Sequence, residues 1–196
     1  MRPTALLAIV CMAAGLATGC ATQQPFRYYT LRVAAEPAAV PSTLVIALGP
    51  VTVPAVVDRP EIVVSTGRNE LKLDDFNRWA SPLQDNLFRV IADDLSTLLG
   101  SPRVIRFPQP LAAEPDYRVA VEVRSFESTL GESASIDAIW TIRRMKDRKT
   151  QTGQTSARER IADPGYEALA AAHSRAAARL SRDIAEAIRQ LQRDAP

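Results

Sequence analysis

The sequence has 196 residues, which is the length of one ordinary domain. It is 46% hydrophobic and 23% charged with 8 glycines, a globular composition that excludes disordered, collagen-like and transmembrane-bundle chains. The formal net charge of +2 is too small to indicate a global field for nucleic acid or for an acidic substrate.

The first nineteen residues differ in kind from the rest. One arginine precedes an uncharged apolar run of about 13 residues, which is typical of a signal peptide and too short to span a bilayer as a helix. Residues 17–20, Ala-Thr-Gly-Cys, resemble a bacterial lipobox, although alanine replaces the leucine usually found three positions before the cysteine. We therefore expect a lipoprotein signal peptide over residues 1–19 and lipidation of Cys20. Cleavage at an ordinary signal peptidase site is the alternative.

The cysteines support a lipid anchor. Cys11 lies inside the signal peptide, so the mature chain keeps only Cys20 and has no disulfide of its own. Acyl chains on Cys20 would hold the protein at a membrane, with residues 20–25 as a short tether. Ala21, and not an aspartate, follows the predicted lipidated cysteine. In bacteria that sort lipoproteins by the residue at this position, the resemblance to a lipobox implies export to the outer membrane, at its periplasmic face.

Residues 26–196 predict a single α/β domain. Residues 26–33 are aromatic and β-branched and predict a first strand. Residues 44–48 are apolar throughout, as in a strand that is buried on both faces. After a proline-rich stretch, residues 61–65 and 70–73 flank a turn and predict a hairpin.

A first helix is predicted next. Ser81 is expected to be its N-cap, with Pro82 at the first helical position and Gln84 closing a capping box. Apolar side chains then recur at spacings of three and four before Gly100. They are Leu83, Leu87, Ile91, Leu95 and Leu98.

Residues 103–107 predict a short strand, and three longer strands follow. Alternating apolar side chains mark the first two, at 117–123 and 136–142, and residues 151–161 predict a third, so that the three form an antiparallel meander. Asp163 and Pro164 are expected to cap a last helix, whose apolar side comprises Leu169, Ala172, Ala176, Leu180, Ile184, Ile188 and Leu191. Together these elements predict a layered, mixed, largely antiparallel sheet with two main helices.

The sequence offers little for catalysis, cofactor binding or metal binding. It has one histidine and lacks metal-ligand pairs, serine-elbow motifs and phosphate-binding loops. His173 is expected to be structural because it falls near the apolar side of the last helix. The acid pairs at 74–75 and 93–94 are expected on solvated turns or helix faces. We therefore predict a protein that is not an enzyme.

Two groups of basic residues could form a binding surface. The first, at the tip of the last hairpin, comprises Arg143, Arg144, Lys146, Arg148 and Lys149. It is expected to be a solvated loop, with contact to phospholipid headgroups or an acidic partner as the alternative. The second is a row of arginines on the last helix. Acids stand at ion-pair spacing from this row, so we expect an exposed face and no nucleic-acid binding.

Several segments resemble a known family, the ABC-type transport auxiliary lipoproteins, which include PqiC-like proteins. The resemblance is carried by residues 28–31, Pro54, residues 58–63, residues 69–71 and, above all, residues 78–83. Ser81 and Val56 depart from the family, in which an acidic residue and an aromatic residue are usual at these places.

The resemblance implies a three-layer α/β sandwich similar to the N-terminal domain of TolB. It also implies a non-catalytic partner of a system that moves lipids between two membranes and contains a permease, an ATPase and an MCE-domain protein. Copies of the chain would form a ring around the end of an MCE tube. Trp79 is expected in the core under the first helix, with a partner surface as the alternative. Two rival functions stay open: an assembly lipoprotein for an outer-membrane β-barrel, and a lipid hydrolase that uses a serine, an aspartate and His173.

Overall fold

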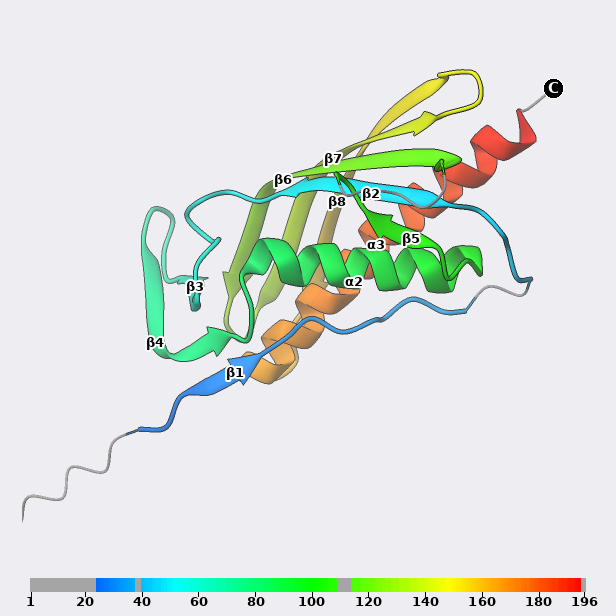
Figure 1. Cartoon of the computed structure of the whole chain (residues 1–196). Coiled ribbons are helices and arrows are strands. Elements are labelled where there is room, and N and C mark those ends of the chain that lie inside the picture. Colours follow the sequence, from blue (N-terminus) through cyan, green and yellow to red (C-terminus); the bar gives the residue numbers. More distant parts are fainter. Residues whose placement is uncertain (1–23, 38–39, 109–113, 195–196) are drawn as a thin grey trace, which may run out of the picture.

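The computed structural model describes residues 24–37, 40–108 and 114–194. Within these ranges the chain folds into two sheets and two helices (Figure 1). The five-stranded sheet has the order β5-β2-β6-β7-β8, and the three-stranded sheet has the order β1-β4-β3. The α/β class predicted from the sequence is confirmed, but the strands form two sheets instead of one.

The five-stranded sheet is built on an antiparallel meander. β6 (Tyr117–Thr129), β7 (Ser133–Arg144) and β8 (Thr150–Arg160) pair in sequence order. Alternate residues of β6 and β7 are buried, as the predicted period of two requires. β2 (Ile46–Thr52) runs parallel to β6 on one side and to β5 (Val104–Arg106) on the other.

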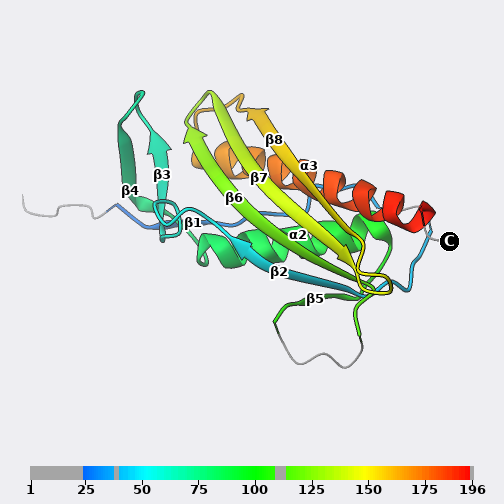
Figure 2. The ribbon, with the colours of Figure 1, turned by 90° about the horizontal axis from the view of Figure 1, so that it is seen from above.

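Both helices cover the same face of the five-stranded sheet (Figure 2). α2 (Leu83–Leu99) packs over β2 and β5, α3 (Tyr166–Arg193) packs over β7 and β8, and the helices contact each other. The apolar side predicted for each helix is buried. The helices and this sheet therefore form two layers. No helix of the described residues covers the opposite face of this sheet.

The segment after β1 (Arg27–Tyr29) differs from its prediction. A strand was expected over residues 26–33, but only three residues pair, in parallel with β4 (Leu71–Trp79). The backbone N–H groups that follow donate to helix side chains: Leu31 to Asn86, Arg32 to Ser174, and both Ala34 and Ala35 to Asp94. These side chains replace a strand partner, because buried backbone donors must be satisfied by some acceptor.

The predicted hairpin of β3 (Glu61–Ser65) and β4 is confirmed, but the start of α2 is not as predicted. Pro82, and not Ser81, is the N-cap, and no N-cap side chain bonds to the helix. The N–H of Gln84 donates instead to Oδ1 of Asp58, at 3.2 Å, from the loop before β3. The C-terminus agrees with the prediction, since Gly100 adopts the left-handed conformation with φ 62°.

Candidate functional site

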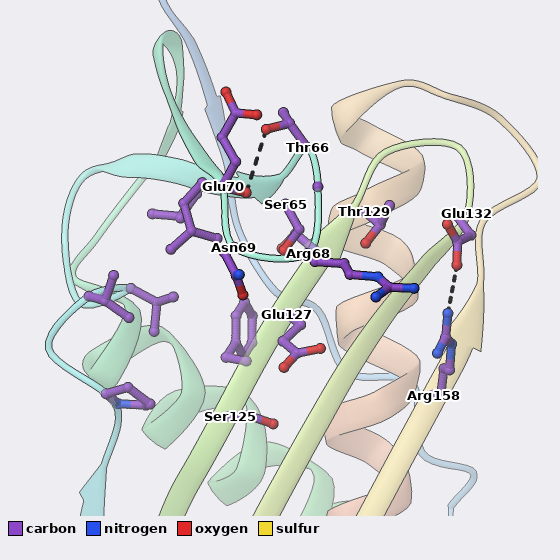
Figure 3. A pocket seen from close by; sticks show the side chains of 18 of the residues that line it. Ser65, Thr66, Arg68, Asn69, Glu70, Ser125, Glu127, Thr129, Glu132 and Arg158 are labelled. Atoms are coloured by element: carbon purple, nitrogen blue, oxygen red, sulfur yellow. Dashed lines mark hydrogen bonds and ion pairs between the residues drawn. The ribbon is translucent and has the colours of Figure 1, made fainter.

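A groove of about 850 Å³ opens between the β3–β4 hairpin and the ends of β6 and β8 (Figure 3). One wall is apolar and includes Pro54, Val56, Val57, Val63 and Leu71. Three arginines and three glutamates also line the groove: Arg68, Glu70, Arg124, Glu127, Glu132 and Arg158. Arg158 donates to Glu132 at 2.7 Å. Since acids and bases balance along the lining, the groove suits an amphipathic segment better than a bare anion.

Phe126, which lines the groove, belongs to an aromatic cluster that joins three elements. Phe126 on β6 stacks on His173 of α3, with ring centroids 3.8 Å apart. Trp79 of β4 meets the same imidazole edge-on at 6.3 Å and is only 4% exposed, so it lies in the core as predicted. Nε2 of His173 lies 2.8 Å from Oγ of Ser128, which is also buried.

The Ser128–His173 pair is poorly suited to nucleophilic catalysis. Burial lowers the pKa of His173 to about 3, so its ring is neutral near pH 7 and is a weak base. Nδ1 of the ring is buried and has no hydrogen-bond partner in the part of the chain that the structure describes. A serine nucleophile needs a competent base and a group that orients this base. The pair therefore has the geometry of a packed polar contact.

Residues 24–37, 40–108 and 114–194 hold neither a cluster of metal ligands nor a membrane-spanning helix. Over these ranges no three His, Cys, Asp or Glu side chains gather as metal ligands would. Neither helix within them has an apolar stretch long enough to cross a membrane. Cys20 and the whole predicted signal peptide lie outside the described residues.

The basic cluster at the β7–β8 turn is only partly exposed. Its exposed and unpaired members in the described chain are Arg143, Lys146 and Arg148. Arg144 is 5% exposed, because the alternation of β7 turns its side chain toward α3. There it donates to the Leu191 carbonyl and pairs with Asp147, and it holds the pKa of Asp147 well below the usual range. Lys149 pairs with Asp194 at 3.1 Å. The expectation of five exposed cations therefore fails for Arg144.

Two carboxylates that were expected on solvated surfaces are buried. Asp94 lies on the buried side of α2, where it accepts hydrogen bonds from the N–H groups of Ala34 and Ala35 and from the Ser181 hydroxyl, and burial raises its pKa. Asp74 accepts the Tyr166 hydroxyl at 2.8 Å and the Asn77 amide at 2.9 Å. Burial acts to raise the pKa of Asp74, but these hydrogen bonds outweigh burial and the pKa is lowered. Asp94 is three residues after Ile91 and four before Leu98, so helical spacing places it on the buried apolar side of α2. This spacing could have predicted its burial in spite of its charge.

Comparison with known proteins shows the fold and the family. No curated protein matches the chain. An uncharacterized protein of known structure has a TM-score of 0.69 and 21% identity, over 84% of this chain and 99% of that one. A protein from Xanthomonas campestris has a TM-score of 0.67 and 20% identity, over 81% of this chain and 92% of that one. The family model of the ABC-type transport auxiliary lipoprotein component matches residues 29–185. The chain therefore belongs to the family of ABC-type transport auxiliary lipoprotein components.

Proposed function

We propose that this protein is a lipid-anchored component of the periplasmic face of the outer membrane. It assists an ABC-type lipid transport system by binding its MCE-domain protein, and it has no catalytic chemistry of its own. The observation that carries the proposal is the family match over residues 29–185 in a chain whose signal-like start ends at Cys20. The family supports the auxiliary role, and the lipobox-like sequence supports the anchor.

The described domain supports a binding role over a catalytic one. The groove has balanced charge and an apolar wall, which suits contact with another protein. The one histidine of the sequence, His173, stacks on the lining residue Phe126 and is held neutral by burial. The predicted acyl groups on Cys20 and the residue after it, Ala21, support the outer membrane as the site of anchoring.

The shape of the domain separates its basic hairpin from β1. α3 has 28 residues and extends about 42 Å. Tyr166 at its start contacts Tyr29 of β1, with ring centroids 6.0 Å apart, while Asp194 beyond its end pairs with Lys149 of the hairpin. The hairpin and β1 thus lie at opposite ends of the domain (Figure 1). Of the two contacts considered for the basic cluster, we therefore propose an acidic partner protein over headgroups at the anchoring membrane.

The anchor is tested by intact mass spectrometry of the mature protein extracted from membranes. We expect wild-type protein to begin at Cys20 and to carry acyl groups, and Cys20→Ala to carry none. Cys11→Ala is the matched control, because the other cysteine lies in the predicted signal peptide and its loss leaves acylation unchanged. An unmodified mature chain that begins at another residue would contradict the proposal.

The partner is tested by copurification with the tagged full chain after crosslinking. We expect an MCE-domain protein, and we expect Lys146→Ala with Arg148→Ala to reduce its recovery by about tenfold, the effect of losing roughly 1.4 kcal/mol of binding. The control, Arg32→Ala with Arg179→Ala, removes two exposed cations elsewhere and should leave recovery unchanged. Recovery of a β-barrel in place of the MCE protein would support the rival assembly role.

We also propose that several copies form a ring. β8 is an outer strand of the five-stranded sheet, and along residues 150–160 its second edge has no strand partner in the described chain. Open strand edges are a common route to pairing between chains. Native mass spectrometry of the acylated protein in detergent should show one discrete multiple of the chain mass, and a monomer at all concentrations would count against the ring.

A further inference from the structure

The outer face of the three-stranded sheet carries exposed aromatic side chains. β1 and β4 run in parallel, with Tyr28 opposite Arg78 and Tyr29 opposite Trp79. Because side chains alternate across a strand, Tyr29 and Trp79 turn toward the core, whereas Tyr28 and Arg78 turn outward. Tyr28 is 62% exposed, and Phe26, two residues earlier, is 53% exposed.

These outward side chains form one cluster, the aromatic face, made of Phe26, Tyr28, Phe76 and Arg78. The rings of Phe26 and Phe76 lie 5.9 Å apart between centroids, and the guanidinium carbon of Arg78 lies 4.7 Å from the Phe26 centroid. Behind the face, the Tyr29 hydroxyl donates to Asn77 at 2.9 Å. This partly buried bond joins β1 to β4, so the fold itself holds the aromatic side chains outward.

The aromatic face begins close to the proposed anchor. Phe26 is six residues after Cys20. Six residues of chain span at most about 20 Å when fully extended. Acyl groups on Cys20 would therefore keep the aromatic face within about 20 Å of the membrane surface. This step rests on the acylation of Cys20 in the proposed function.

We propose that the aromatic face lies against the phospholipid headgroups of the leaflet that holds the acyl chains of Cys20. Aromatic rings collect at the headgroup level of membranes, where their apolar bodies are partly buried. Arg78 supplies N–H donors for phosphate beside these rings. The anchor and the aromatic face together give two contacts with the membrane. They orient the domain so that α3 carries the basic hairpin away from the bilayer.

The experiment uses the full acylated chain in vesicles of phosphatidylethanolamine and phosphatidylglycerol, with and without brominated phospholipid. Tyr28→Trp places an indole on the aromatic face, while native Trp79 and Trp140 are buried at 4% and 6% exposure. Thr152→Trp is the matched control, on an exposed position of β8 near the basic hairpin. We expect bromine to reduce the added fluorescence of Tyr28→Trp by about half and to leave Thr152→Trp unchanged.

The outcomes separate this proposal from the anchor on which it rests. If mass spectrometry shows acylation but bromine does not affect Tyr28→Trp, the aromatic-face proposal is overturned and the anchor stands. If the emission depends on protein density in the vesicles and not on bromine, a second copy covers the face, and the proposal is again overturned. A mature chain without acyl groups overturns both.

Discussion

Buried polar side chains connect the parts of this domain. Asp94 accepts backbone donors from the segment after β1 and the Ser181 hydroxyl from α3, so one carboxylate links three segments. Asp74 links β4 to the start of α3 through Tyr166. The sequence predicts that His173 faces the core, because its helical spacing is unambiguous. It cannot predict that Asp74 is buried, because its partner Tyr166 is 92 residues away along the chain.

The neutral state of His173 predicts how stability depends on pH. Its pKa is lowered from 6.5 to about 3 by burial, so the unfolded chain binds a proton below pH 6.5 that the folded chain does not bind. The contribution of His173 is therefore fully present above pH 6.5 and is lost as the pH falls toward 3. Between pH 7 and pH 5 it should lower the free energy of unfolding by about 2 kcal/mol.

Denaturant unfolding of wild-type protein and of His173→Gln at both pH values measures this loss. The variant should be less stable at pH 7 but should lack this part of the pH dependence. Because the chain has one histidine, its nuclear magnetic resonance signal gives an independent check. A titration midpoint near pH 6.5 in the folded protein would show that the imidazole is not buried as described.

At the level of single elements, the spacing of apolar residues predicts the features that neighbouring residues determine. The apolar stripe of α2 and the alternation of β6 and β7 need no distant partner, and both are confirmed. The start of α2 and the length of β1 depend on distant side chains, Asp58 and Asn86, so the predictions based on neighbouring residues are wrong there. The groove lining was also missed, since it combines the β3–β4 hairpin with β6 and β8.

Gly153 shows how one strand position is fixed by its neighbour. It lies opposite Trp140 in the β7–β8 register, and a Cβ added to Gly153 would stand 2.2 Å from the indole. Gly153→Ala must therefore displace a buried ring whose Nε1 donates to Thr155 at 3.1 Å. We expect a loss of about 1–3 kcal/mol, typical of overpacking, seen as a fall in Tm.

The control for Gly153→Ala is Thr152→Ala, which changes the adjacent exposed side chain of the same strand. It should change the free energy of unfolding by less than about 0.5 kcal/mol. Thermal unfolding followed by near-ultraviolet circular dichroism measures Tm and reports the tryptophan environment at the same time. Equal Tm values for the two variants would mean that the indole has free space over β8.

At the scale of the whole molecule, α3 sets the distance between the two ends of the domain. The sequence predicts this helix and its buried side, and its length follows from the same pattern. It does not predict that both helices share one face of the five-stranded sheet, because periodicity identifies a buried side without identifying what covers it. The separation of the basic hairpin from β1 thus emerges only from the assembled fold (Figure 1).

Arg144 is the buried side chain that fixes the basic hairpin to the far end of α3. It joins Asp147 in the turn to the Leu191 carbonyl near the end of the helix, whereas its neighbour Arg143 points to solvent. Arg144→Ala should lower Tm by a few degrees, because it removes a buried side chain and leaves its acceptors without their donor. Arg143→Ala should leave Tm unchanged while removing the same charge. Hydrogen exchange over residues 143–150 should increase only in Arg144→Ala, and equal exchange in both variants would show that the hairpin is oriented by the sheet alone.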